Sequence, residues 1–404
     1  MTAETVFTRI TAPLQALLKK EAEQLNGDSS KYKLSLYFFT MNLVYAIIKK
    51  TTSISLLVTD IKTLPDAQRL GLVDGSKSMY SEAFGRYDPK LFRRIFLALL
   101  EQLDFLEIQE IKALGRFILV DGSIFPALKT MAWATYTGTS NALKMHLAFE
   151  LNRMIPVQFI STDANGNEKA ALLAMLEAGV TYIADRGYVS FKVFRQITRR
   201  QAFFIIRVKA NLSVLVSTSL DVVVPASWLA LFSEVSDSLI SFANDKHQAT
   251  YRLVSFVAYD EVYRIATNRL DLTTGQIIML YAYRWQIELF FRFIKRTFNA
   301  LHLWSHSGRG VEIQFYLYLI VYLLLIQFKQ GLKQEQETIE SAHKTVPKDQ
   351  EKHLSRTPGR GIVTLLGKKL SQFWKMSIHW LKSIQNLLLN PLTPRVVEII
   401  NATQ

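Results

Sequence analysis

Apolar positions divide the chain into a helical first quarter and a longer region in which short strands alternate with helices. Leu34–Ile48 is apolar and rich in aromatic residues, and Asp88 stands where it would cap an amphipathic stretch that runs to Leu103. The intervening Gly75–Tyr87 is polar and carries Lys and Arg, which indicates a connection. The pattern predicts a helical N-terminal domain over residues 1–112.

From Gly115 onward, the apolar runs are short and end at turn-forming residues. The predicted order is three meandering strands, a helix, a strand, a helix and a strand: Phe117–Val120, Ala142–Leu151, Ile155–Ser161, Asn165–Glu177, Thr181–Ala184, Phe191–Arg200 and Ala202–Val208. This is the layout of a ribonuclease-H-like fold. The predicted fold class is therefore α/β, with a ribonuclease-H-like mixed-sheet core.

The rest of the chain is organised around this core. Residues 210–270 are β-rich by pattern, and we interpret them as an inserted β subdomain within a core domain that spans residues 113–330. Lys333–Arg360 is dense in charge and contains Pro and Gly. Residues 331–404 are therefore predicted to be a linker followed by a helical C-terminal region.

Net charge and composition narrow the class of protein. The net charge of +14 favours an anionic partner, nucleic acid first and an anionic membrane second. The absence of cysteine excludes disulfides and thiolate zinc sites, and it fits a reducing cytoplasm. With nucleic acid as the expected partner, the predicted location is cytoplasmic and nucleoid-associated. Phe315–Ile326 is an apolar run of 12 residues. A bilayer span needs about 20 residues, so we interpret this run as a buried core helix.

A local basic run adds to the net charge. No acidic residue lies between Arg186 and Leu220, whereas seven residues there are basic: Arg186, Lys192, Arg195, Arg199, Arg200, Arg207 and Lys209. Such a run suits a track for phosphates, or it is a solvated basic helix face. The N-terminal helices also allow two interpretations, a DNA-binding domain or a plain helical bundle.

The segment Tyr281–Lys295 carries a polar strip among aromatic and aliphatic residues. If the segment is one continuous helix, a strip about 60° wide holds Tyr281, Arg284, Glu288 and Lys295, with Arg292 beside it. One carboxylate among cations and a phenol suits a helix that offers an oxygen to a metal while its neighbours hold phosphates. The alternative is an ordinary ion-pair ladder at i, i+4 and i+8.

Two further carboxylates stand at the ends of predicted strands. Asp121 and Asp185 each follow an apolar strand, and a glycine comes one or two residues later, which lets the backbone turn and a ligand approach. Cleavage of a phosphodiester at neutral pH is served by two divalent ions on a few hard oxygen ligands. With Glu288, the two aspartates make such a set, although an Asp at a strand end is most often a turn former.

The spacing of these residues resembles that of a known family. The pattern Y-x2-R-x3-E-x6-K, formed by Tyr281, Arg284, Glu288 and Lys295, is similar to the signature of bacterial DDE transposases of the insertion-sequence-four type. Val-Asp-Gly-Ser around Asp121 and Ala-Asp-Arg-Gly-Tyr around Asp185 resemble the first and second acidic motifs of that family. The resemblance covers about residues 75–330.

The resemblance implies a cut-and-paste DNA transposase, which is a metal-dependent endonuclease and strand transferase. Such an enzyme binds the terminal inverted repeats of its element and a target duplex, as a homodimer on DNA and without a membrane. Asp121, Asp185 and Glu288 would be catalytic and would hold two Mg²⁺ ions, for which Mn²⁺ would substitute. The residues implied to contact DNA are Tyr281, Arg284, Lys295, Arg292 and Arg186. An aromatic residue would stack a flipped base if a hairpin intermediate forms, and its position stays open among Trp228, Tyr251 and Tyr263.

Other interpretations stay open. A chain that kept the fold without catalysis would be a DNA-binding relic or repressor, and a membrane-associated basic protein would use Phe315–Ile326. His302 and His306 have i, i+4 spacing, but nearby glycines indicate a loop, and no third zinc ligand is evident. Asp163 and Glu168 flank a Gly-Asn turn and are predicted to serve the N-terminus of the next helix.

Overall fold

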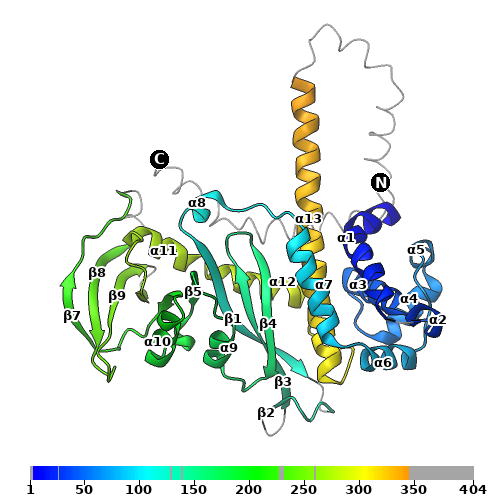
Figure 1. The fold of residues 1–404 in the computed structure, drawn as a ribbon, viewed down its shortest axis with the longest axis horizontal. Helices are drawn as coiled ribbons and strands as arrows, with labels where there is room; N and C mark the ends of the chain where they lie inside the picture. Colours follow the sequence, from blue (N-terminus) through cyan, green and yellow to red (C-terminus); the bar gives the residue numbers. More distant parts are fainter. Residues whose placement is uncertain are drawn as a thin grey trace. The chain divides into compact units, whose positions relative to one another are not determined.

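The chain divides between a helical unit and a sheet-containing unit, as seen in a computed structural model (Figure 1). The structure describes residues 3–25, 27–127, 130–137, 140–226, 232–258 and 261–344. Among these, the helical unit holds the residues up to Leu106 and those from Phe293 onward. The sheet-containing unit holds Glu107–Arg292.

In the helical unit, several helices pack around one long helix, α13. The elements are α1 (Ala3–Glu23), α2 (Asp28–Lys31), α3 (Leu36–Lys49), α4 (Ile54–Thr63), α5 (Pro65–Arg69), α6 (Lys77–Arg86), α7 (Pro89–Gln102) and α13 (Gly308–Lys344). Helix α13 contacts α1, α3, α6 and α7. The predicted helices near Leu34 and after Asp88 are confirmed as α3 and α7, and the Asp88 carboxylate accepts a hydrogen bond from Lys90 N at 2.9 Å.

The segment Gly75–Tyr87 is mostly helix α6, not the predicted connection. The Ser76 hydroxyl caps its first turn by accepting from Met79 N. The buried side chains of α6 are Tyr80, Ala83 and Phe84, which share one face because they are three and four residues apart. The polar residues between them obscure this spacing in the sequence.

Helix α13 confirms the predicted core helix at Phe315–Ile326. By length and composition, Gly308–Leu332 could cross a membrane, but 89% of its most apolar window is buried inside the protein. Every residue from Phe315 to Ile326 is buried.

Helix α13 also corrects one predicted boundary. It runs to Lys344 because no Gly or Pro interrupts residues 333–344, so the linker does not begin at 331. The remainder of the predicted linker and C-terminal region, residues 345–404, lies outside the described residues. The core-domain boundary at 330 stays a prediction: it falls inside α13, and the described part of the sheet-containing unit reaches Arg292.

The second unit is built on one sheet of ten strands. These are β1 (Arg116–Ala127), β2 (Thr135–Thr137), β3 (Ser140–Glu150), β4 (Ile155–Asp163), β5 (Val180–Ala184), β6 (Phe203–Arg207), β7 (Val214–Ser219), β8 (Ser233–Phe242), β9 (Thr250–Ala258) and β10 (Glu261–Thr267). The order is β2-β3-β1-β5-β6-β10-β9-β8-β7, with β4 also paired to β3. Strand β1 is antiparallel to β3 and parallel to β5, and β5 is parallel to β6. The predicted ribonuclease-H-like α/β fold is confirmed.

Strands β7 to β10 lie within the β-rich residues 210–270 that were predicted to form an inserted subdomain, and they extend this same sheet. Strand β10 pairs with β6, from Ile265 opposite Arg207 to Thr267 opposite Ile205. Strands β9, β8 and β7 then follow by antiparallel pairing. The sequence pattern identifies strands but carries no signal for the strand to which β10 pairs.

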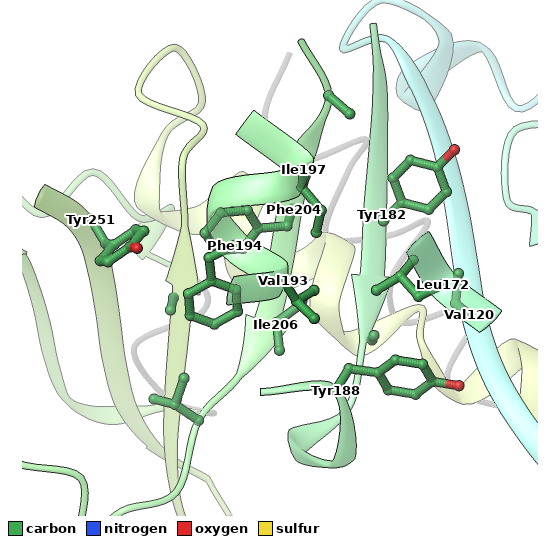
Figure 2. Close-up of a cluster of buried hydrophobic side chains, with 14 of the residues drawn as sticks. Val120, Leu172, Tyr182, Tyr188, Val193, Phe194, Ile197, Phe204, Ile206 and Tyr251 are labelled. Carbon is green, nitrogen blue, oxygen red and sulfur yellow. The ribbon is translucent and has the colours of Figure 1, made fainter. Parts of the chain in front are cut away.

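Alternation along the strands gives the sheet two apolar faces. One face carries Ile118, Tyr182 and Phe204 and packs against α9 (Glu168–Ala174) and α10 (Phe191–Arg199). Figure 2 shows this face, where Phe194 of α10 stacks on Phe204 of β6 with ring centroids 4.4 Å apart. The other face packs against α11 (Thr274–Ala282) and α12 (Trp285–Thr297), since α11 contacts β5 and β6, and Phe290 of α12 contacts Phe149 of β3. A short helix, α8 (Gln109–Lys112), precedes β1.

Candidate active site

The parallel pairing of β1 with β5 ends just before two acidic residues. Val120 opposite Ala184 is the last pair of that ladder, so Asp121 and Asp185 follow it on neighbouring strands. Strand β1 continues to Ala127 because it still pairs with β3, and Asp121 lies opposite Leu147. The prediction that the strand ends at Asp121 is therefore wrong. The two acids nevertheless stand at the carboxyl end of the parallel pairing, where α/β sheets commonly bind ligands.

The charged form of Asp121 is disfavoured by its surroundings. Its Oδ1 atom accepts a hydrogen bond from Gly122 N at 2.8 Å. Burial, together with the charges of Glu288 and Glu168, raises the pKa of Asp121 to about 6, although the Gly122 N–H and Arg284 act in the opposite direction. Glu288 and Glu168 therefore lie within electrostatic range of Asp121.

Tyr281 and Glu288 lie on different helices, so the interpretation of Tyr281–Lys295 as one helix is wrong. Helix α11 ends at Ala282, α12 begins at Trp285, and Arg284 N donates to Tyr281 O at 3.0 Å in the intervening turn. The Tyr281 hydroxyl donates to Asp185 Oδ1 at 3.4 Å. Burial raises the pKa of Tyr281 to about 12, so its phenol remains a proton donor at neutral pH.

Arg284 is the cation shared by the three candidate acids. It forms an ion pair with Glu288 at 2.7 Å, and the two side chains are 14% and 30% exposed. Its charge also acts on Asp121 and interacts with that of Asp185. The Arg284–Glu288 pair of the alternative ion-pair ladder therefore exists. This pair is half-buried and lies near two further carboxylates, whereas the pairs of an ordinary ladder are solvated.

The other predicted DNA-binding residues lie close in sequence to these acids. Arg186 directly follows Asp185 and is exposed. Arg292 is exposed as well, with its guanidinium 5.9 Å from the centroid of the Trp285 ring. Lys295 is partly buried on the same helix as Glu288, about 10 Å further along its axis.

The basic run that begins at Arg186 has acidic partners elsewhere in the chain, contrary to the sequence prediction. Arg195 donates to the buried Asp245 at 2.8 Å, and Arg207 pairs with Glu261 of β10. A continuous track of seven uncompensated cations is therefore wrong. The exposed cations of the run are Arg186, Lys192, Arg199, Arg200 and Lys209.

Two of the three aromatic residues considered for base stacking are already engaged. Tyr251 is 5% exposed and belongs to the apolar cluster of Figure 2. Tyr263 stacks on Phe256 with centroids 5.1 Å apart, and the Arg207 guanidinium is 4.2 Å from its ring centroid. Trp228 lies outside the described residues.

Carboxylate oxygens suit a hard divalent cation, and the environment of Asp121 tests whether one fits here. Among the described residues, no three His, Cys, Asp or Glu side chains are close enough together, as they stand, to hold an ion, and His302 and His306 are no exception. Asp121, Asp185 and Glu288 each have one oxygen engaged, with Gly122 N, Arg186 N and Arg284. A cation would favour the charged form of Asp121, against the burial and the neighbouring carboxylates that raise its pKa. The donors are thus of the kind that suits a hard divalent cation in chemistry and charge.

One acidic residue near this site lies where the sequence predicts it, at a helix N-terminus. Glu168 is the first residue of α9, and Asn167 caps the helix by accepting from Lys169 N and Ala170 N. The Glu168 carboxylate also accepts from Lys144 of β3 at 2.8 Å. This second contact links two distant segments, and local sequence signals do not reveal it.

Comparison with known proteins places this geometry in a family. Residues 112–324, more than half of the chain, match the model of the transposase DDE domain. Relatives named as transposases include y4zB of Sinorhizobium fredii, which is 28% identical over 61% of this chain and 69% of that protein. Another, of insertion sequence element IS5377 from Geobacillus stearothermophilus, is 24% identical over 48% of this chain and 52% of that protein. A third, of element IS4SA from Synechocystis sp., is 21% identical over 61% of this chain and 70% of that protein.

A solved structure with some likeness is the piggyBac transposase synaptic complex with hairpin DNA, with a TM-score of 0.41 and 9% identity over 74% of this chain and 66% of that one. The family match itself runs from just before β1 into α13 and includes Asp121, Asp185 and Glu288. The resemblance seen in the sequence is confirmed, and the chain belongs to the DDE transposases of insertion sequences.

Proposed function

We propose that this transposase moves its element by cutting and pasting DNA. It binds the terminal inverted repeats, cleaves DNA at the element ends in a metal-dependent reaction, and joins the freed 3′-hydroxyl to target DNA. The observation that supports this most directly is the electrostatic coupling of Asp121 with Glu288, and of Arg284 with both Glu288 and Asp185, where β1 and β5 part. Carboxylates with perturbed pKa values that converge from distant parts of a chain are typical of functional sites.

Each candidate residue has a role in the proposal. Asp121, Asp185 and Glu288 would hold two Mg²⁺ ions, with Mn²⁺ able to replace them. When bound, such ions relieve charge on the attacking and leaving oxygens of a phosphodiester. The Tyr281 hydroxyl orients the Asp185 carboxylate through their hydrogen bond. Arg284 would hold a phosphate next to the cleaved bond.

The proposed partner is double-stranded DNA, both as element ends and as target. The net charge of +14 and the exposed cations Arg186 and Arg292 support it. Lys295 would contact a phosphate further along α12 from Glu288. A homodimer on DNA would hold two element ends together, which cut-and-paste chemistry requires.

Three substitutions test the catalytic assignment one carboxylate at a time. Asp121→Asn, Asp185→Asn and Glu288→Gln keep the shape of each side chain and remove its charge. Each should abolish nicking, in Mg²⁺, of a duplex taken from the DNA that flanks the reading frame, while gel-shift binding of that duplex stays largely intact. Asp163→Asn is the matched control, because Asp163 is an exposed acid at the end of β4. A substituted carboxylate whose variant still nicks the duplex is not catalytic.

The alternative function is a DNA-binding relic or repressor with the same fold. Such a protein would bind the flanking duplex, but the wild-type chain would nick it in neither Mg²⁺ nor Mn²⁺. The presence of all three acids favours the enzyme, because a relic has no need to retain Asp121, whose charged form is disfavoured by burial.

A further inference from the structure

Glu168 brings a fourth carboxylate to the edge of the sheet where Asp121 and Asp185 lie. Its Oε1 atom is 3.4 Å from the position that a Cβ on Gly122 would occupy, and its Oε2 atom is 2.9 Å from that of a Cβ on Gly187. Gly122 directly follows Asp121, and Gly187 is two residues after Asp185. The carboxylate therefore lies between the two acidic motifs, in space that both glycines leave open.

Glu168 approaches from the opposite side of the sheet to Glu288. It is the first residue of α9, which covers the same face as α10, whereas Glu288 belongs to α12 on the other face. The sheet-side partner of Glu168 is Lys144 of β3, and the two side chains are 29% and 13% exposed. This charged hydrogen bond engages Oε1 and leaves Oε2 directed toward Gly187.

Two buried polar atoms beside Glu168 have no hydrogen-bond partner among the described residues, although the other ring nitrogen of His146, Nε2, lies 3.0 Å from the Thr162 hydroxyl. His146 is fully buried, and its Nδ1 atom lies 3.5 Å from the same point at Gly122 that Glu168 Oε1 approaches. The Tyr188 hydroxyl is also buried without a partner, within electrostatic range of Asp121, Glu168 and Asp185. Buried polar groups are nearly always paired in native proteins, so each of these atoms calls for a partner that the described residues do not supply, such as water or a ligand.

We propose that Glu168 is a fourth carboxylate of the candidate active site, held in place by Lys144, and that it supplies an oxygen to the hydrated divalent cation shared by Asp121 and Asp185. The inference rests on the proposed function, because it adds a residue to the same metal site. It accounts for two features that helix capping does not, the Lys144 contact and the small residues at positions 122 and 187.

Titration of the full-length, DNA-free protein with Mn²⁺, followed by electron paramagnetic resonance of the free ion, tests this without measuring catalysis. Glu168→Gln should weaken Mn²⁺ binding by about tenfold or more, the range typical of residues that support a metal site. Asp163→Asn, an exposed acid five residues earlier, should bind Mn²⁺ as the wild type does. Circular dichroism should show that both variants are folded. Should Gln prevent folding, Glu168→Asp keeps the charge with a shorter reach, and the same loss is expected.

Asp121→Asn in the same titration separates this inference from the proposed function. Loss of binding in Asp121→Asn with wild-type binding in Glu168→Gln would reject the role of Glu168 and leave the three-carboxylate site standing. Wild-type binding in both variants would reject the metal site altogether. Loss of binding in both supports the four-carboxylate site.

Discussion

Arg284, the residue just before α12, donates to Glu288 in the first turn of that helix, with 2.7 Å between nitrogen and oxygen. In the absence of DNA, this cation offsets the charge of one of the three candidate acids. A phosphate that takes the guanidinium would release the carboxylate for a metal ion. Under the proposed function, the pair would couple DNA binding to the availability of Glu288, because one guanidinium would serve both the carboxylate and the phosphate.

Neutralising Arg284 and Lys295 together should weaken binding to element ends and reduce its dependence on salt. Each phosphate contact contributes about 0.9 to the slope of log affinity against log salt concentration. Fluorescence-anisotropy titrations of the Arg284→Gln, Lys295→Gln double variant at several salt concentrations should show a slope smaller by up to about 1.8. Lys112→Gln is the control, since Lys112 pairs with Glu107. A double variant with the wild-type slope would contradict the phosphate contacts.

Asp121→Asn should stabilise the metal-free protein at neutral pH. The folded-state pKa of Asp121 is about 6, above its ordinary value of 3.8, so ionising this side chain disfavours the fold. The penalty, on the order of 1–3 kcal/mol, is complete above pH 6 and disappears as the pH falls below about 4, where the carboxyl is protonated in both states. Calorimetry in EDTA should therefore give the variant the higher melting temperature at pH 7.5, with a smaller difference at pH 4.5. Equal melting temperatures at pH 7.5 would show that Asp121 is not strained by burial.

Substituting Arg252 should lower the free energy of unfolding by more than substituting a surface cation does. Its guanidinium bonds both oxygens of the buried Asp237, at 2.9 and 2.6 Å. Arg252→Met leaves that carboxylate buried without a cation and should lower the free energy of unfolding by about 3–5 kcal/mol in urea titrations. Arg94→Met, which breaks an exposed pair with Glu21, should cost about 1 kcal/mol or less. Equal losses in the two variants would contradict the importance of burial.

A methyl group at Gly187 should displace the Glu168 carboxylate, because the new Cβ would stand 2.9 Å from its Oε2 atom. Gly187→Ala should therefore weaken Mn²⁺ binding, and the Gly187→Ala, Glu168→Gln double variant should bind little worse than Glu168→Gln alone. Gly85→Ala is the control, since nothing lies within 4 Å of a Cβ there. Fully additive losses would mean that the two positions act independently.

Elements with local signals were predictable from the sequence. Strand β5 is a short apolar run, and α7 starts at a capping Asp followed by Pro. Features that depend on distant partners were not predictable: β1 continues past Asp121 only because β3 pairs with it. The break between Ala282 and Trp285 has no Gly or Pro to mark it, which is why an angular argument over one helix failed.

The candidate site likewise has features that were predictable from the sequence and features that were not. Asp121, Asp185 and Glu288 could be named from the sequence because each stands in a recognisable local context. Their electrostatic coupling, the contact between Tyr281 and Asp185, and the approach of Glu168 all depend on how α9, α11 and α12 pack on the two faces of the sheet. Spacing along the chain contains no measure of these distances.

The hydrogen bonds between β6 and β10 join the outer strands to the part of the sheet that carries Asp121 and Asp185. A chain shortened by excision of residues 214–258 would bare one side of β10 and withdraw Phe242 and Tyr251 from beneath α10. A displacement of β7, β8 or β9 would be transmitted through β10 and β6 to β5, the strand that leads directly into Asp185. Efforts to miniaturise this enzyme would therefore do better to spare those strands and remove material elsewhere.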